Sequence, residues 1–369
     1  MSQMKTPGVY VQEIAPVQPI LGLPTAVTAF VGRTGHGPAG VAAPVDGQAA
    51  FEAAYGPADR AYPLTLAVAD FFANGGEAAV IVRLPGDATT QASLDSALAA
   101  LKQTPFNILY LSPDQIEGDV PVFARETAAA FVVEREAMMI LEAPAAWATA
   151  KIDEMTVDAL GYFSEPQLSR MACYVSRLLD ESGPRPSGGA VAGIWARTDR
   201  KDGVWTAPAG IRADFASGVP QRFLTDGDNA ALSARGLNAL RSFPGHDAVI
   251  WGVRTLSWVS DTFRYVPARR LVDHIEDSVE GGLARAATQP PSPALFVTVQ
   301  AQVSAFLTEI WKAGGLMGAN AAESFYVVCD MSNNGPYIGQ GVLRVDMGLA
   351  VQHPAEFVPV SVLVEVAAT

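Results

Sequence analysis

The chain has 369 residues, of which 49% are hydrophobic and 17% charged, and its formal net charge is −13. This composition excludes a disordered chain and allows two or three domains with a substantial core. The acidic balance argues against nucleic-acid binding, and it fits either plain solubility or a basic partner.

The cysteines and the N-terminal residues indicate the cellular compartment in which the protein is made. Cys173 and Cys329 form no CxxC pair, so we expect neither a disulfide framework nor a zinc site. The first residues lack the apolar core of a signal peptide, and no apolar run approaches the roughly 20 residues that span a bilayer. We therefore expect a protein made and assembled in the cytoplasm, without direct membrane insertion, even where it later leaves the cell.

Residues 1–22 predict an extended arm. A strand-like run is followed by two expected hinges, Pro16 and Gly22. Fourteen extended residues reach about 45–50 Å, more than the radius of gyration of about 20 Å for a body of this size. The arm either adds a strand to a neighbouring subunit or folds back on its own body. Its candidate pairing residues are Val9, Tyr10, Val11 and Ile14.

Residues 23–235 predict short strands and helices in alternation. Residues 23–85 read as an N-terminal α+β segment that packs with the C-terminal domain. Residues 86–235 alternate helix and strand, which is typical of a parallel sheet with helices on its faces. We expect this α/β middle domain to be the part that most resembles an enzyme fold.

Residues 236–357 predict an α+β C-terminal domain. It holds a strand near 248–253, two helices with apolar stripes, and two strands around an Asn-Asn-Gly hairpin turn at 333–335. Four arginines form a candidate contact with a tube or another subunit, although internal pairing with the acids at 273–280 is equally compatible. They are Arg254, Arg264, Arg269 and Arg270.

Residues 358–369 predict a second strand arm. Valines alternate along it with period two, which favours a strand with one apolar face. We expect hinges at Pro354 and Pro359. The candidate pairing residues are Val360, Val362, Val364 and Val366.

The sequence lacks the common motifs for nucleotide binding, zinc-dependent proteolysis and serine-hydrolase catalysis. It contains no GxxxxGK[ST] phosphate loop, no HExxH and no GxSxG. The run from Asp330 imitates the start of a calcium loop, but its twelfth position is Gly341 rather than a carboxylate. We expect no catalytic, cofactor-binding or metal-binding residues, and no enzyme.

The chain resembles contractile tail sheath proteins of phage tails and of phage-derived contractile injection systems, in a short minimal form. Pro267 departs from the family pattern, where Asn is expected. The order and spacing of the matching segments carry the resemblance: 6–14, 24–34, 37–38, 51–56, 190–199, 203–208, 251–256, 264–276 and 354–357.

The resemblance implies a structural subunit that polymerises as stacked six-subunit rings around an inner tube. It implies terminal strands that exchange with neighbouring subunits, a hydrolase-like middle domain without an active site, and contraction that drives the tube through an envelope. Implied partners are further copies, the tube protein, baseplate and terminator proteins, and sheath paralogues. The particle is then a phage tail or a released contractile particle.

Three other interpretations stay open at this point. A hydrolase or transferase predicts a pocket in the α/β domain with a convergent nucleophile and base. A non-contractile baseplate or capsid component predicts strand exchange without a second, shorter helical state. A plain soluble α/β protein predicts a monomer whose ends pair within its own body.

Overall fold

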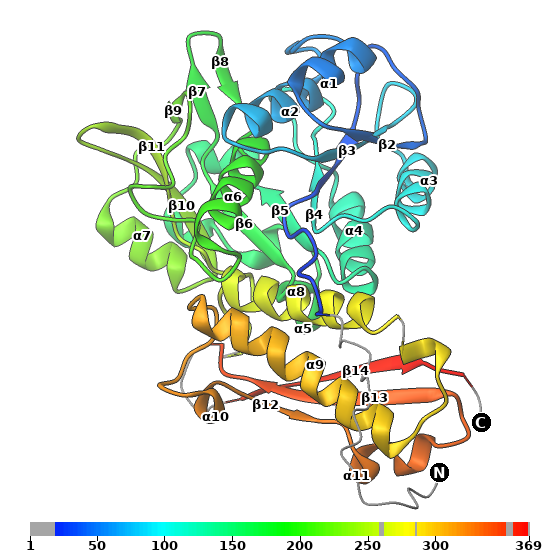
Figure 1. Ribbon diagram of the computed structural model, residues 1–369. Coiled ribbons are helices and arrows are strands. Elements are labelled where there is room, and N and C mark those ends of the chain that lie inside the picture. Colours follow the sequence, from blue (N-terminus) through cyan, green and yellow to red (C-terminus); the bar gives the residue numbers. More distant parts are fainter. Residues whose placement is uncertain (1–18, 258–261, 285, 352–356, 368–369) are drawn as a thin grey trace, which may run out of the picture.

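A computed structural model describes residues 19–257, 262–284, 286–351 and 357–367. Two bodies lie on either side of one long helix, α8 (Val266–Gly282) (Figure 1). The larger body is built around a sheet, and the smaller body around three strands near the C-terminus.

The large sheet has eight strands in the order β11-β10-β6-β5-β4-β1-β3-β2. Neighbours from β10 to β3 run parallel, while the edge strands β2 and β11 are antiparallel to their partners. The chain adds β3 on one side of β1 and β4 to β10 on the other, so the winding direction changes between β1 and β4. The strands are β1 (Thr28–Gly32), β2 (Ala42–Val45), β3 (Ala79–Arg83), β4 (Ile108–Leu111), β5 (Met138–Glu142), β6 (Met171–Val175), β10 (Leu237–Phe243) and β11 (His246–Trp251).

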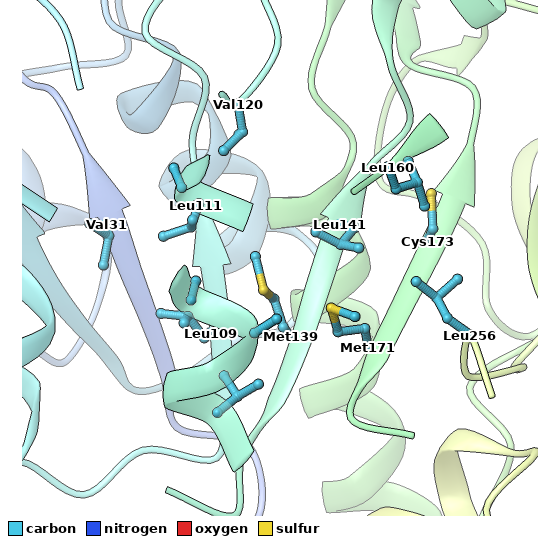
Figure 2. Close-up of a cluster of buried hydrophobic side chains, with 14 of the residues drawn as sticks. Val31, Leu109, Leu111, Val120, Met139, Leu141, Leu160, Met171, Cys173 and Leu256 are labelled. Carbon is cyan, nitrogen blue, oxygen red and sulfur yellow. The ribbon is translucent and has the colours of Figure 1, made fainter. Parts of the chain in front are cut away.

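Helices cover both faces of this sheet, so its central strands are apolar at nearly every position. One face packs against α3 and α4, and Figure 2 shows part of that core, including Leu109, Met139 and Cys173. The other face packs against α1, α2 and α6. The helices of this body are α1 (Gln48–Tyr55), α2 (Pro63–Ala73), α3 (Gln91–Leu101), α4 (Val122–Glu134), α5 (Glu165–Leu168), α6 (Gly188–Asp202) and α7 (Asp226–Ser233).

Short elements decorate the larger body. Three 3-10 turns follow β5, and a small antiparallel sheet in the order β8-β7-β9 extends from the end of the large sheet opposite α8 (Figure 1). These elements are η1 (Ala145–Ala148), η2 (Ile152–Glu154), η3 (Val157–Ala159), β7 (Leu178–Asp180), β8 (Gly183–Arg185) and β9 (Val219–Pro220).

The smaller body is an antiparallel sheet in the order β12-β13-β14, covered on one face by α8 and α9. Helix α9 alone among the described helices has the length and apolar composition of a membrane span, which our expectation from the sequence overlooked. Its apolar side chains pack into the core of this body. The elements are α9 (Pro293–Lys312), α10 (Ala321–Ser324), α11 (Met331–Asn334), β12 (Phe325–Val328), β13 (Val342–Leu349), β14 (Val358–Glu365), η4 (Ala286–Thr288) and η5 (Gly335–Tyr337).

The predicted class of mixed α/β with a parallel sheet is correct, but two predicted domain boundaries are wrong. The boundary at 85/86 is wrong because β1 lies between β3 and β4 in one sheet. Residues 23–85 thus belong mainly to the α/β body. The boundary at 235/236 is wrong because β10 and β11 extend the same sheet.

The predicted hairpin turn at 333–335 also needs correction. Strands β12 and β13 do pair antiparallel, but α11 and η5 connect them. Asp330 caps α11 by accepting from the amide of Ser332. The side chain of Asn334 then hydrogen bonds to both the carbonyl and the amide of Arg344, so this run folds as a helical turn tied to β13.

Candidate assembly site

Strand β14 has the alternating burial that the valines predict. It pairs with β13 over eight residues, from Leu349 opposite Val358 to Val342 opposite Glu365. Val360, Val362 and Val364 point into the core under α8 and α9, with 6% to 7% of each exposed. Val366 follows the strand, is buried as well, and donates its amide to the carbonyl of Gly341 at 2.6 Å.

The position of β14 makes it a candidate for pairing between subunits. It is the last strand of its sheet among the described residues, so one of its backbone edges has no strand beside it. Such an edge is a template for another strand. Its outward residues include Ser361 and Leu363, and Leu363 is 56% exposed.

Two of the predicted hinge residues, Pro359 and Gly22, lie in ordered, packed segments rather than in flexible connections. Pro359 is inside β14, opposite Gly348, where an exposed edge strand tolerates its missing amide hydrogen. Gly22 is packed against α8, since a Cβ on it would lie 3.1 Å from Cε1 of His274. Pro16 and Pro354 lie outside the described residues, as do Val9, Tyr10, Val11 and Ile14.

The prediction that Arg269 and Arg270 face a partner is wrong, because both are buried and paired within the chain. Arg270 is 4% exposed, and its guanidinium contacts both carboxylate oxygens of Asp199 at 2.6 and 2.9 Å. Arg269 contacts Asp273 at 2.5 Å and Glu276 at 3.0 Å. These pairs also explain why arginines begin α8, where the helix dipole disfavours them.

The other two arginines lie just before α8 and are half-buried. Arg254 and Tyr265 form a backbone bridge, and the guanidinium of Arg254 lies 5.3 Å from the ring centroid of Tyr265. The carbonyl of Arg264 accepts from the amide of Thr255. Their role in a partner contact stays a prediction.

Sequence reasoning missed the ionic cluster between α8 and the large sheet. Arg170, just before β6, pairs with Asp273 at 2.9 Å, and both side chains are about nine-tenths buried. Burial, with the nearby charges of Asp273 and Glu136, raises the pKa of Glu276 to about 7 and that of Asp277 to about 6. The i, i+4 spacing of Arg269 and Asp273 was the signal for it in the sequence.

At the carboxyl ends of the parallel strands, where open α/β sheets bind ligands, the chain's own side chains fill the space. Where the winding direction changes, a Cβ on Gly32 would lie 2.8 Å from Cβ of Ser112. At the end of β5, Oε1 of Glu142 accepts from the hydroxyl of Tyr110 at 3.0 Å and the amide of Gly188 at 2.5 Å. The cavity beside Glu142 is about 10 Å³, the size of one water molecule.

Burial raises the pKa of Glu142, although the amide of Gly188 and the charge of Arg177 oppose the shift. Burial also raises the pKa of the Tyr110 hydroxyl, helped by the adjacent Glu142. No group of three or more His, Cys, Asp or Glu side chains is arranged to hold a metal ion within the described part of the chain. Glu142 is buried and serves as an internal hydrogen-bond partner for the start of α6.

The chain was compared with family models, with curated proteins and with solved structures, and the last two comparisons match tail sheath or contractile injection system proteins. No family model matches the chain. The tail sheath protein of Vibrio phage KVP40 is 28% identical over 152 residues, which is 40% of this chain. The matched segment covers 22% of that protein, so the chain spans well under two thirds of this curated relative's length.

Solved structures match over nearly the whole chain. Two structures of the anti-feeding prophage baseplate, one six-fold symmetrised and one contracted, share 23% and 26% identity with TM-scores of 0.76 and 0.73, each covering 96% of this chain and 98% of theirs. A contracted sheath complex of PVC, an extracellular contractile injection system, shares 22% identity with a TM-score of 0.76 and covers 97% of both chains.

The matched proteins are structural components of tail sheaths and contractile injection systems, which supports a structural rather than an enzymatic role. The chain is similar to contractile tail sheath proteins, in sequence over part of its length and in fold over nearly all of it. The resemblance inferred from the sequence and the expected absence of enzymatic function are thus confirmed by similarity to these proteins.

Proposed function

We propose that the chain is a sheath subunit that assembles in the cytoplasm as stacked rings of six around an inner tube and later contracts. The six-fold symmetry of the anti-feeding prophage baseplate supports the ring. The contracted state of the PVC sheath supports a second, shorter lattice. The proposed partners are further copies, an inner tube protein, baseplate and terminator proteins, and paralogous sheath subunits.

The observation that carries this proposal is the edge of the sheet at β14, beside which no further strand lies among the described residues. Four buried valines, at about 1.5 kcal/mol each, contribute about 6 kcal/mol wherever the strand docks on a β13. A β14 that docks on a neighbour's β13 keeps these contacts, so exchange costs little once subunits are concentrated in a lattice. The strand-like residues 6–14 of another subunit are suited to pair with the remaining edge.

Contraction would then draw on energy stored during assembly. An extended lattice held by a kinetic barrier converts to a contracted lattice of lower free energy. Exchanged strands keep neighbours connected while the bodies move as rigid units. Energy stored in this way would drive the step without nucleotide hydrolysis, in keeping with a sequence that contains no GxxxxGK[ST] phosphate loop.

A disulfide trap tests the exchange of β14. Arg344 and Leu363 lie opposite one another on β13 and β14, and the native cysteines are both buried. We would mix R344C protein with L363C protein, assemble sheaths and oxidise. Exchange predicts a disulfide between chains in sheaths and none in monomers.

The control mixes R344C with E365C, which is two residues out of register and should crosslink far less. Equal crosslinking of both pairs, or none in assembled sheaths, would overturn the exchange. Negative-stain electron microscopy of the concentrated protein tests polymerisation itself. Hollow helical tubes are expected, and deletion of residues 1–14 should abolish long tubes while the subunit stays folded.

A further inference from the structure

The segment 19–25 lies along helix α8 as a strap. Its contacts follow one face of the helix at a spacing of four residues, and residues four apart share a face. In Figure 1 the described chain starts beside α8 and rises into the larger body, and its contacts run opposite in direction to α8, since Ile20 lies by Gly282 and Thr25 by Arg270. The contacting pairs are Thr25 with Arg270, Gly22 with His274, Leu23 with Ser278, and Ile20 with Gly282.

Small residues on α8 make room for the strap. The side chain of Ile20 is 6% exposed, and a Cβ on Gly282 would lie 2.8 Å from two of its carbons. Ser278 is fully buried, and its hydroxyl oxygen accepts from the amide of Leu23 at 3.0 Å. The strap is therefore seated in a shaped surface, not merely laid across the helix.

A buried clamp holds the other end of the strap. The hydroxyl of Thr25 donates to Oδ2 of Asp199 at 2.6 Å, and Arg270 donates to the carbonyl of Thr25 at 2.8 Å. Arg270 and Asp199 are paired, with side chains 4% and 5% exposed. Since Asp199 belongs to α6, the clamp joins the strap to both bodies.

The C-terminal strand packs against the same helix. Leu271, Ile275 and Val279 of α8 share a core with the inward valines of β14. These residues alternate along α8 with the ones that contact the strap. Helix α8 thus carries the root of the N-terminal arm on one face and the C-terminal strand on another.

We propose that strap 19–25, helix α8 and strand β14 form one mechanical connection between the two ends of the subunit, with Thr25, Asp199 and Arg270 as its clamp. This inference rests on the proposed function, because exchanged arms are what would pull on the strap. A pull on residues 1–18 passes into α8 and from there to the β14 packed under it, its own or an exchanged one from a neighbour, without crossing the large sheet. The Asp199 contact makes the larger body turn with α8.

Single-molecule pulling of the monomer tests the connection. Handles attach at S2C and at A230C, an exposed position on α7, and the native cysteines are buried. In the wild-type chain the strap should stay bound until the body unfolds. In T25V, and in the double variant D199N/R270M, a separate step of about 25 Å should appear at lower force, the contour length of seven extended residues.

Arg200→Gln is the matched control, because it breaks an exposed ion pair with Glu77 one residue after Asp199 and should behave as wild type. T25V removes only a hydroxyl and keeps the test valid should the double variant not fold. An early step in the wild-type chain, or no early step in T25V, would overturn the proposal. If the chain forms no sheaths but its strap stays bound under force, the proposed function is wrong and the mechanical connection is still supported.

Discussion

Nη1 of Arg170 lies 2.9 Å from Oδ2 of Asp273, and this buried ion pair joins the turn before β6 to the middle of α8. Asp273 also receives Arg269 from one turn earlier on the same helix. A carboxylate shared by two guanidinium groups balances charges that would otherwise be buried alone. It is therefore a principal contact between the larger body and α8.

Replacing Asp273 with Asn should destabilise the chain by about 3–5 kcal/mol, because it leaves two buried arginines without their shared carboxylate. Equilibrium urea unfolding at pH 7 measures the loss. Glu134→Gln is the control, since its pair with Lys102 is about half exposed and should change stability by about 0.5 kcal/mol or less. Similar small losses for both variants would show that the pair does not join the bodies.

Local sequence patterns predict where the strands and helices of this fold lie in the chain, but they do not predict which strands are adjacent in the sheet. Buried strands such as β4 and β5 are visible as short apolar runs, and the valines of β14 as a period of two. The place of β1 between β3 and β4 depends on contacts between residues about 50 and 80 apart, which periodicity does not encode. The predicted domain boundaries failed for that reason.

The four arginines in and before α8 show that sequence patterns also fail to predict distant partners at a candidate site. Four arginines within 17 residues look like a surface patch when read along the chain. The partner of Arg270 is Asp199, 71 residues away, and Arg170 reaches Asp273 across 103 residues. Burial of a charge depends on such distant partners, so the sequence left pairing with the acids at 273–280 as one of two alternatives and did not predict the burial.

Glu276 makes the junction sensitive to pH. Its pKa of about 7 in the folded chain is raised above the usual value of 4.5, so its contribution is favourable while it is protonated and is lost as pH rises through 7. Glu276→Gln should therefore increase stability by about 2 kcal/mol at pH 8 relative to wild type, and change it little at pH 4.

Thermal unfolding of both proteins from pH 4 to 8.5 checks this difference. Glu309→Gln on α9 is the control, because its carboxylate is 73% exposed and should leave the pH profile unchanged. A glutamine variant at 276 that is less stable than wild type at pH 8 would mean that the ion pair with Arg269 outweighs the burial.

Adjacent residues of β14 should differ in their effect on stability. Val362 points into the core and is 7% exposed, whereas Leu363 points outward and is 56% exposed. Val362→Ala should cost about 1–2 kcal/mol from lost burial and the cavity left behind, and Leu363→Ala about 0.5 kcal/mol or less. Urea unfolding of the monomer measures both, and equal costs would contradict the observed register.

Substitutions of Glu142 test whether the side chains at the carboxyl ends of the strands stabilise the fold. Replacing it with Ala removes the acceptor for the amide of Gly188 and the hydroxyl of Tyr110, and two buried donors left unsatisfied cost about 2–6 kcal/mol. Glu142→Gln keeps an oxygen that accepts from both donors and avoids burying a charge, so it should cost far less. Chemical denaturation at pH 7 separates the two variants. Because the carboxylate serves as a hydrogen-bond acceptor inside the subunit, sheath formation by Glu142→Gln should match wild type; its loss in a folded variant would mean that the charge of Glu142 matters for assembly.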